Sequence, residues 1–162
     1  MNTNYIFVIA LGMGIVAGLR SLTAPAVTSW AAHLGWLNLH GTAVAFMGTL
    51  AAALIFTLLA VLEFVTDLLP KTPSRTKPGP LTARIIMGAL CGACICAAAG
   101  QSLILGAVLG GIGAIIGAYS GYQARTKLVN RFHVKDVFVA IPEDIVAIGI
   151  ACLLITFSLR GS

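Results

Sequence analysis

The chain has 162 residues, of which 59% are hydrophobic and 9% charged, and its formal net charge is +5. Water-soluble domains carry about 25% charged residues, so this composition argues against a soluble enzyme and predicts an all-α integral membrane protein. The apolar runs do not alternate with polar residues as β-barrel strands do. A helix crosses the hydrocarbon core with about 20 apolar residues. On that basis, residues 1–162 are predicted to form one membrane domain with about five transmembrane helices.

The first apolar run predicts a helix over residues 5–25. No Lys or Arg precedes it, whereas a signal peptide usually starts with basic residues, so we interpret it as a membrane helix. Its only basic residue is Arg20. This side chain would either extend to the outer surface or, if the helix breaks near Pro25, face the interior of the bundle. Residues 26–41 contain two Trp and two His and are expected in the outer interface or as a re-entrant piece.

The second predicted helix, residues 42–69, carries two carboxylates near its end. Glu63 and Asp67 are four residues apart and therefore share one face of the helix. Asp67 could simply end the helix among the lipid headgroups, but Glu63 lies about 9 Å inside the predicted end of the helix at Leu69. An acidic side chain at such a depth is costly, faces the protein interior and indicates a functional site.

Three further helices are predicted at residues 81–100, 103–123 and 137–159. The first of them contains three cysteines among Ala and Gly, which we expect to pack rather than to bind a metal. The last begins after a proline with Glu143 and Asp144. These two acids could stabilise the positive end of the helix dipole, or one of them could face the interior of the helix bundle.

Glycine spacing predicts close helix packing. The fourth helix has five glycines spaced four, three, four and four residues apart, on one face, and the first helix has two glycines four residues apart. Small residues at this spacing let the backbones of membrane helices approach closely. A narrow pore lining or a hinge is the alternative. The glycines expected to pack are Gly14, Gly18, Gly106, Gly110, Gly113, Gly117 and Gly121.

Basic residues predict the orientation in the membrane. They gather between the second and third helices and between the fourth and fifth. Cytoplasmic connections carry an excess of Lys and Arg, so five crossings would place the N-terminus in the cytoplasm and the C-terminus outside. Because topology already accounts for these charges, no nucleic acid partner is predicted.

Two pairs of segments within the chain are similar. GIVAGLRS (residues 14–21) resembles GAIIGAYS (113–120), and AVLEFV (60–65) resembles AIPEDIV (140–146). With one helix between them, they would form two inverted two-helix repeats around a central helix, a common plan in transporters. Chance similarity among Gly-, Ala- and Ile-rich helices is the alternative.

All five acidic residues fall toward the cytoplasmic side of this predicted arrangement. Arginine is a good partner for a carboxylate or a phosphate, and one arginine starts the third helix on the same side. No phosphate-binding glycine loop, catalytic triad or nucleotide motif is present; no cofactor is predicted, and metal binding stays open. The candidate residues for binding an ion or substrate are Arg20, Glu63, Asp67, Arg84, Glu143 and Asp144.

Four segments carry a resemblance: AGLRSLTAPAV, LEFVTDLLPKTPSR, ARIIMGALCGA and PEDIVAIG. They are similar to the signature segments of an uncharacterised bacterial inner-membrane family, the domain of unknown function 4126. The similarity covers nearly the whole chain and fits a shorter branch with a compact connection before the fifth helix. It implies a bacterial inner-membrane location but no reaction or substrate. The motif positions that it matches are Gly18, Arg20, Glu63, Asp67, Pro70, Glu143 and Asp144.

Three functions are consistent with these features. The leading hypothesis is a small transporter or channel-like protein, a homodimer or other homo-oligomer, whose acidic layer binds a cation or relays protons. The alternative is a metal-dependent enzyme or binder acting on lipid phosphates, in which carboxylates hold Mg²⁺ and basic residues gather headgroups. The third is a structural or assembly protein whose glycine faces pack against partners. Enzymatic activity is therefore left open, with transport favoured.

Overall fold

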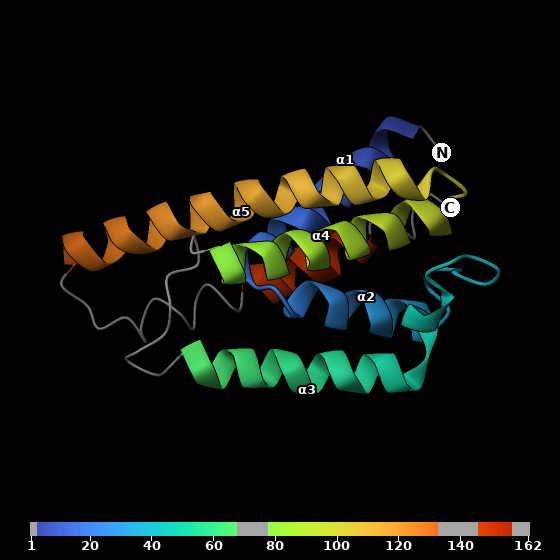
Figure 1. The fold of residues 1–162 in the computed structure, drawn as a ribbon, viewed down its shortest axis with the longest axis horizontal. Helices are drawn as coiled ribbons and strands as arrows, with labels where there is room; N and C mark the ends of the chain where they lie inside the picture. The colour runs from blue at the N-terminus through green and yellow to red at the C-terminus, as the bar shows by residue number, and fades with distance from the viewer. Residues whose placement is uncertain (1–2, 68–77, 133–145, 157–162) are drawn as a thin grey trace.

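The computed structural model describes residues 3–67, 78–132 and 146–156. Within these ranges every regular element is a helix, as the composition predicted. In chain order (Figure 1), the elements are α1 (Thr3–Leu19), α2 (Thr23–His33), the short 3-10 helix η1 (Ala45–Gly48), α3 (Leu50–Asp67), α4 (Pro78–Ala98), α5 (Leu103–Phe132) and an unlabelled helical segment, Val146–Thr156.

The continuous helix predicted over residues 5–25 is wrong. α1 ends at Leu19, and after a break at residues 20–22 a separate helix, α2, begins. Pro25 lies in the first turn of α2, where proline is tolerated because the N–H that it lacks would have no helical partner. The predicted interfacial segment 26–41 therefore starts as helix. Thr28 and Ser29 of α2 are completely buried, so this part packs inside the molecule.

The other predicted helices are present with different ends. The run predicted at 42–69 forms η1 and then α3, which starts at Leu50. The run at 81–100 is α4, starting at Pro78, and the run at 103–123 is α5, which continues to Phe132. Of the run at 137–159, residues 146–156 are described and are helical.

Gly100 ends α4 and turns the chain into α5. Its φ of 66° is in the left-handed region, which glycine adopts without strain. The N–H of Gln101 then donates to the carbonyl of Cys96 (2.8 Å), which satisfies one of the last carbonyls of the helix. α4 and α5 therefore form a tight antiparallel hairpin.

α1 and α5 contact each other at the backbone. A Cβ built on Gly113 would lie 3.0 Å from the Cα of Gly14, and one built on Gly117 would lie 3.0 Å from the Cα of Gly18. No side chain larger than hydrogen fits between the two helices at these positions. Residue numbers increase in the same order in the two contacts, from Gly14 to Gly18 in α1 and from Gly113 to Gly117 in α5. The two helices therefore run in the same direction.

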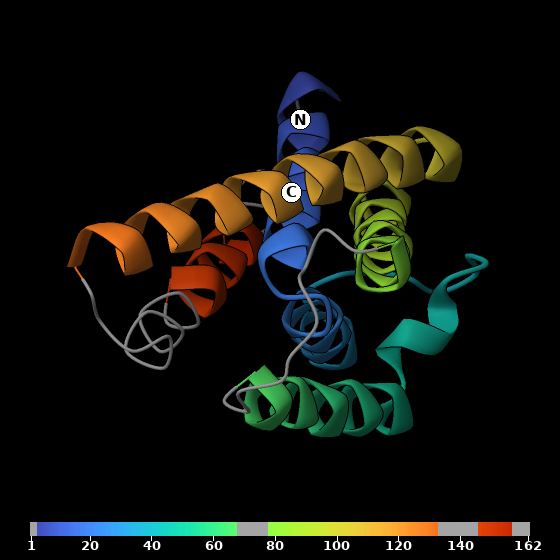
Figure 2. The ribbon, with the colours of Figure 1, turned by 60° about the vertical axis from the view of Figure 1, so that its left-hand side comes forward.

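α4 approaches α5 just as closely through two glycines that were not singled out from the sequence. A Cβ on Gly110 would overlap the carbonyl of Gly88, and one on Gly92 would overlap the carbonyl of Gly106. α1, α4 and α5 thus form the close-packed part of the molecule, and α2 and α3 lie along one side of it (Figure 2). Gly121 is buried one turn beyond Gly117.

The prediction of two inverted repeats is wrong for the first of the two segment pairs that suggested it. Of the second pair, residues 140–145 lie outside the described residues. Residues 14–21 and 113–120 lie side by side and run in the same direction, whereas inverted repeats would run in opposite directions. The physical reason is the helix break, since α2 returns the chain and adds one traverse to the predicted path. For the same reason α1 and α3 run in the same direction (Figure 1), where the five-helix prediction had them antiparallel.

Within the described ranges, two helical stretches are long and apolar enough to cross a membrane by length and composition, Pro78–Ala98 and Leu103–Ala124. Thr3–Leu19, Leu50–Thr66 and Val146–Thr156 are shorter apolar helices.

Substituting neighbouring glycines of α5 tests the backbone contacts. Gly110→Ala should destabilise the fold by about 1 to 3 kcal/mol, because the new methyl group must push α4 away. Gly111→Ala is the matched control. Its Cβ would lie 3.7 Å from Ile85, an ordinary contact. Alanine also has a higher helix propensity than glycine, so the free energy of unfolding of Gly111→Ala should increase by up to about 1 kcal/mol. Thermal unfolding in detergent measures both, and equal effects would contradict the packing described here.

Candidate functional site

The carboxylate of Glu63, in α3, lies against the break between α1 and α2. Its side chain is 10% exposed. Oε1 accepts hydrogen bonds from the N–H (3.0 Å) and the hydroxyl (2.6 Å) of Ser21, and Oε2 accepts one from the N–H of Leu22 (2.9 Å). The shortest bond has the length of a strong hydrogen bond between a hydroxyl and an ionised carboxylate. Glu63 therefore joins α3 to the break through three hydrogen bonds.

Glu63 supplies the acceptor that the start of α2 lacks. Backbone N–H groups at a helix start have no helical partner, and the side chain of the N-cap residue usually accepts from one of them. In α2 the N-cap is Leu22, which makes no such bond and has no acceptor in its side chain. Glu63, from another helix, instead accepts from the N–H groups of Leu22 and of Ser21 before it, as the glutamate of a capping box accepts from the N–H of the cap residue. The positive end of the α2 dipole favours its negative charge.

Arg84, in the first two turns of α4, also contacts this region. We call Gly18, residues 20–22, Glu63 and Arg84 the junction. Arg84 is 5% exposed; its Nη1 donates to the carbonyl of Gly18 (3.2 Å) and its Nη2 lies 3.7 Å from Oε1 of Glu63. Gly18 belongs to the last turn of α1, where a helix carries partial negative charge. The arginine and the carboxylate therefore complement opposite helix ends and also pair with each other.

Arg20 lies in the break itself and is 2% exposed. Its guanidinium carbon is 5.7 Å from the centre of the Phe64 ring, within the range of a cation–π interaction. Of the two placements expected from the sequence, the structure shows the interior one. Arg20 and Glu63 lie at the same end of the molecule, whereas the continuous first helix would have placed them toward opposite sides.

The structure thus brings together Arg20, Glu63 and Arg84 from three separate parts of the chain. Asp67 is the last residue of α3, one turn beyond Glu63, and its side chain is outside the described part. Glu143 and Asp144 also lie outside the described ranges, so their predicted role stays a prediction.

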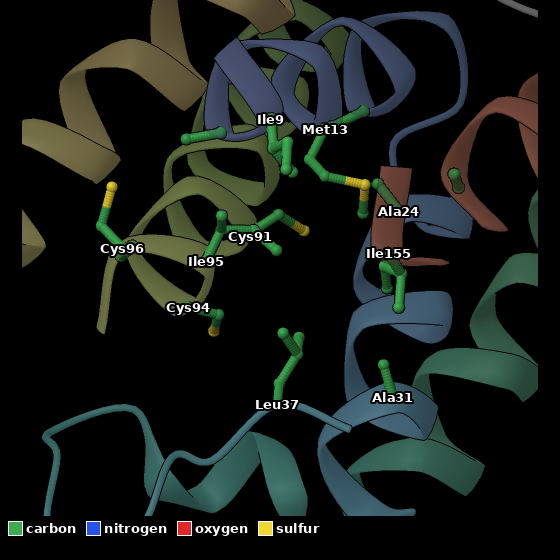
Figure 3. Packing of buried hydrophobic residues seen from close by; sticks show 14 of the residues in the cluster. Ile9, Met13, Ala24, Ala31, Leu37, Cys91, Cys94, Ile95, Cys96 and Ile155 are labelled. Atoms are coloured by element: carbon green, nitrogen blue, oxygen red, sulfur yellow. The ribbon is translucent and has the colours of Figure 1, made fainter. Parts of the chain in front are cut away.

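The three cysteines of α4 are buried in the apolar core. Figure 3 shows Cys91 near Met13, while Cys94 and Cys96 point in different directions. Among residues 3–67, 78–132 and 146–156, no group of three His, Cys, Asp or Glu side chains is placed to hold a metal ion. The cysteines here contribute to packing, and the metal-dependent alternative gains no support from these ranges.

Ser21 is the most informative residue that was missed from the sequence, since it provides two of the three hydrogen bonds to Glu63. Trp30 was expected at an interface, but its indole N–H donates to the hydroxyl of Thr57 (2.9 Å) and connects α2 to α3. Ser21 and Pro25 lie on either side of the start of α2, and this combination is a weak helix-start signal, because Ser21 is not the cap residue itself.

Neutralising the carboxylate tests the strength of the junction. Glu63→Gln keeps the size of the side chain but loses the charge and one acceptor oxygen. Hydrogen bonds to charged groups contribute about 1.5 to 3 kcal/mol, and we expect a loss of that order in the free energy of unfolding. Thermal or denaturant unfolding in detergent measures it, and an unchanged stability would show that the cap is dispensable.

Exchanging the charges of Glu63 and Arg84 tests whether each charge is required at its own position. A simple ion pair would recover when Glu63→Arg is combined with Arg84→Glu. Here the combined variant should remain at least as unstable as the worse single variant, because an arginine cannot accept from Leu22 and a glutamate cannot donate to Gly18. Recovery of the melting temperature in the double variant would contradict this account.

One protein family matches the sequence that contains these residues. The chain matches one protein family, described as a domain of unknown function (DUF4126), over residues 7–161. This match includes Gly18, the break at residues 20–22, Glu63 and Arg84. No curated protein and no solved structure matches the chain. The chain belongs to the DUF4126 family.

Proposed function

We propose that this chain is a small integral membrane protein of the transporter or channel-like type, and that Glu63, Arg84 and Arg20 form its ion-handling site. The observation that carries the proposal is the shielded carboxylate at the helix break. Membrane transporters commonly bind substrates and ions where a helix is interrupted, because the interruption leaves helix ends directed at the site. A charged group within a membrane segment also indicates function by default.

Exposed apolar side chains support membrane embedding. Ile104 of α5 is 75% exposed, and Val8 of α1 and Leu58 of α3 are each 62% exposed. In the two longest apolar helices, fewer than half of the residues are buried inside the molecule. Water would make apolar surfaces of this extent unfavourable, whereas lipid chains cover them without cost.

The orientation that we propose differs from the one expected with five crossings. Basic residues directly follow α3 (Lys71, Arg75 and Lys77) and lie in the last two turns of α5 (Arg125, Lys127 and Arg131), and both helices end at the Glu63 end of the molecule (Figure 1). The positive-inside rule makes this end cytoplasmic in a bacterial inner membrane. α1 starts at the opposite end (Figure 1), which we therefore propose to lie outside.

The chemistry of the site follows from its charges. A proton on Glu63 would remove the negative charge that Arg84 and the start of α2 stabilise, and would loosen the junction. A cation would compete with Arg84 for the same carboxylate. Either event changes how α3 is held against α1 and α4, so ion binding and helix movement are linked at one side chain.

Flux through liposomes tests the proposed function. Liposomes containing the purified protein should dissipate a pH or cation gradient faster than protein-free liposomes. Glu63→Gln should reduce this flux at least tenfold. Thr126→Ala is the control, because its exposed hydroxyl only bonds within α5, to Tyr122. Native mass spectrometry of the same preparation reports whether the protein is a homodimer or a larger homo-oligomer, as proposed.

Wild-type flux in Glu63→Gln would overturn an ion-handling role for this residue. The structural or assembly function is the second candidate, favoured by the backbone contacts of the glycines and by the capping role of Glu63. It predicts that Glu63→Gln and Gly110→Ala lower stability while protein-containing and protein-free liposomes show the same flux.

Labelling with a membrane-impermeant maleimide tests the orientation. In a Cys152→Ser background, Asn4→Cys should react in intact spheroplasts because α1 starts outside. Thr126→Cys, near the Glu63 end, should react only after the membrane is opened. The reverse pattern would show that the proposed orientation is wrong.

A further inference from the structure

Three hydrogen-bond donors and one guanidinium group surround the carboxylate of Glu63. The donors are the N–H and hydroxyl of Ser21 and the N–H of Leu22. The guanidinium is that of Arg84, whose Nη2 lies 3.7 Å from Oε1 and whose side chain is 6% exposed. We call these four groups the oxyanion seat. Backbone N–H groups at a helix start, a hydroxyl and an arginine are the donors with which proteins bind carboxylates and phosphates. The structure shows the seat with one such oxyanion in it, supplied by α3.

We propose that Glu63 is a replaceable occupant of the oxyanion seat, and that the phosphate or carboxylate group of a solute or lipid headgroup binds there when Glu63 leaves. This rests on the proposed function and names its substrate class as anionic. Glu63 would leave when it takes up a proton or pairs with a cation, so release of the seat follows from ion handling at the same residue.

The donors and the occupant differ in how freely they move. The N–H groups of Ser21 and Leu22 belong to the backbone at a helix start and cannot turn away, while Glu63 reaches them through a rotatable side chain. Buried donors without an acceptor are costly, by about 1 to 3 kcal/mol each. Once the carboxylate leaves, the seat therefore favours another oxyanion of similar size.

The depth of the seat supports a ligand from the membrane surface. The contact between Gly18 and Gly117 places the helix break beside the part of α5 that leads to Tyr119 and Tyr122. These tyrosines are 47% and 43% exposed, and exposed tyrosines gather at the boundary between lipid chains and headgroups. The seat thus lies near headgroup depth, where lipid phosphates and dissolved anions are both in reach.

Chemical rescue of Glu63→Ala tests the seat. This variant removes the carboxylate and leaves room for a small anion. Added formate, acetate or inorganic phosphate should raise its melting temperature in a saturable way, by about 2 to 4 °C for each kcal/mol of binding. Tryptophan fluorescence, to which Trp30 in α2 and Trp36 both contribute, reports the transition. Sodium chloride at equal ionic strength should have no such effect.

The double variant Glu63→Ala with Arg84→Gln is the matched control and should lose the rescue. To distinguish the sources, Glu63→Ala is compared in nanodiscs of phosphatidylcholine alone and with phosphatidylglycerol. Stabilisation by phosphatidylglycerol in phosphate-free buffer indicates a lipid headgroup, and stabilisation by inorganic phosphate alone indicates a solute. No saturable anion effect, or an equal effect in the double variant, would overturn the proposal.

If Glu63→Ala does not fold in the absence of added anions, it is purified in the presence of formate or phosphate instead. Recovery of folded protein with either anion supports the seat, and failure with both overturns it. Failure here is separable from failure of the proposed function. Flux that depends on Glu63 without anion rescue removes the seat alone, whereas anion rescue without flux removes the transport function alone.

Discussion

The start of α2 needs a hydrogen-bond acceptor that its own sequence does not provide, and much of the structure is arranged around this need. Leu22 stands where a Ser, Asp or Asn would normally cap the helix. Glu63 supplies the missing oxygens, which places the end of α3 beside the end of α1. Arg84 then balances the carboxylate and the last turn of α1. One cap therefore holds α1, α2, α3 and α4 together at one end of the molecule.

Two kinds of contact hold this protein, and they differ in how easily they can be changed. α1, α4 and α5 meet at glycine backbones, a contact that leaves no free space and cannot adjust gradually. α3 is joined to the rest through apolar packing of Ala53 and Phe56 and through polar contacts, among them those of Glu63 and the bond between Trp30 and Thr57. A proton or an ion can alter polar contacts of this kind. The molecule thus combines a rigid three-helix part with a side whose attachment depends on charge.

Much of the candidate site could be expected from the sequence. A glutamate deep in an apolar helix and an arginine beside a glycine motif are costly in lipid, which predicted an interior position for Glu63 and, as one of two alternatives, for Arg20. That Arg84 joins them could not be predicted, because it depends on where α4 packs. Ser21 could not be recognised with the same ease, because serine is common in apolar helices and its role depends on which acceptor faces it. The glycines of α5 were predictable as a face, but their division between α1 and α4 was not.

The sequence by itself determined the helical class, the approximate helices and the residues that lipid would not tolerate unpaired, because composition and apolar run length depend only on local chemistry. Only the tertiary structure decided where α1 stops and which way α3 runs. An apolar sequence through residues 5–25 is compatible with one helix or two, and the choice depends on whether a distant acceptor satisfies the N–H groups at the break. Glu63 is that acceptor, and it lies more than forty residues away along the chain.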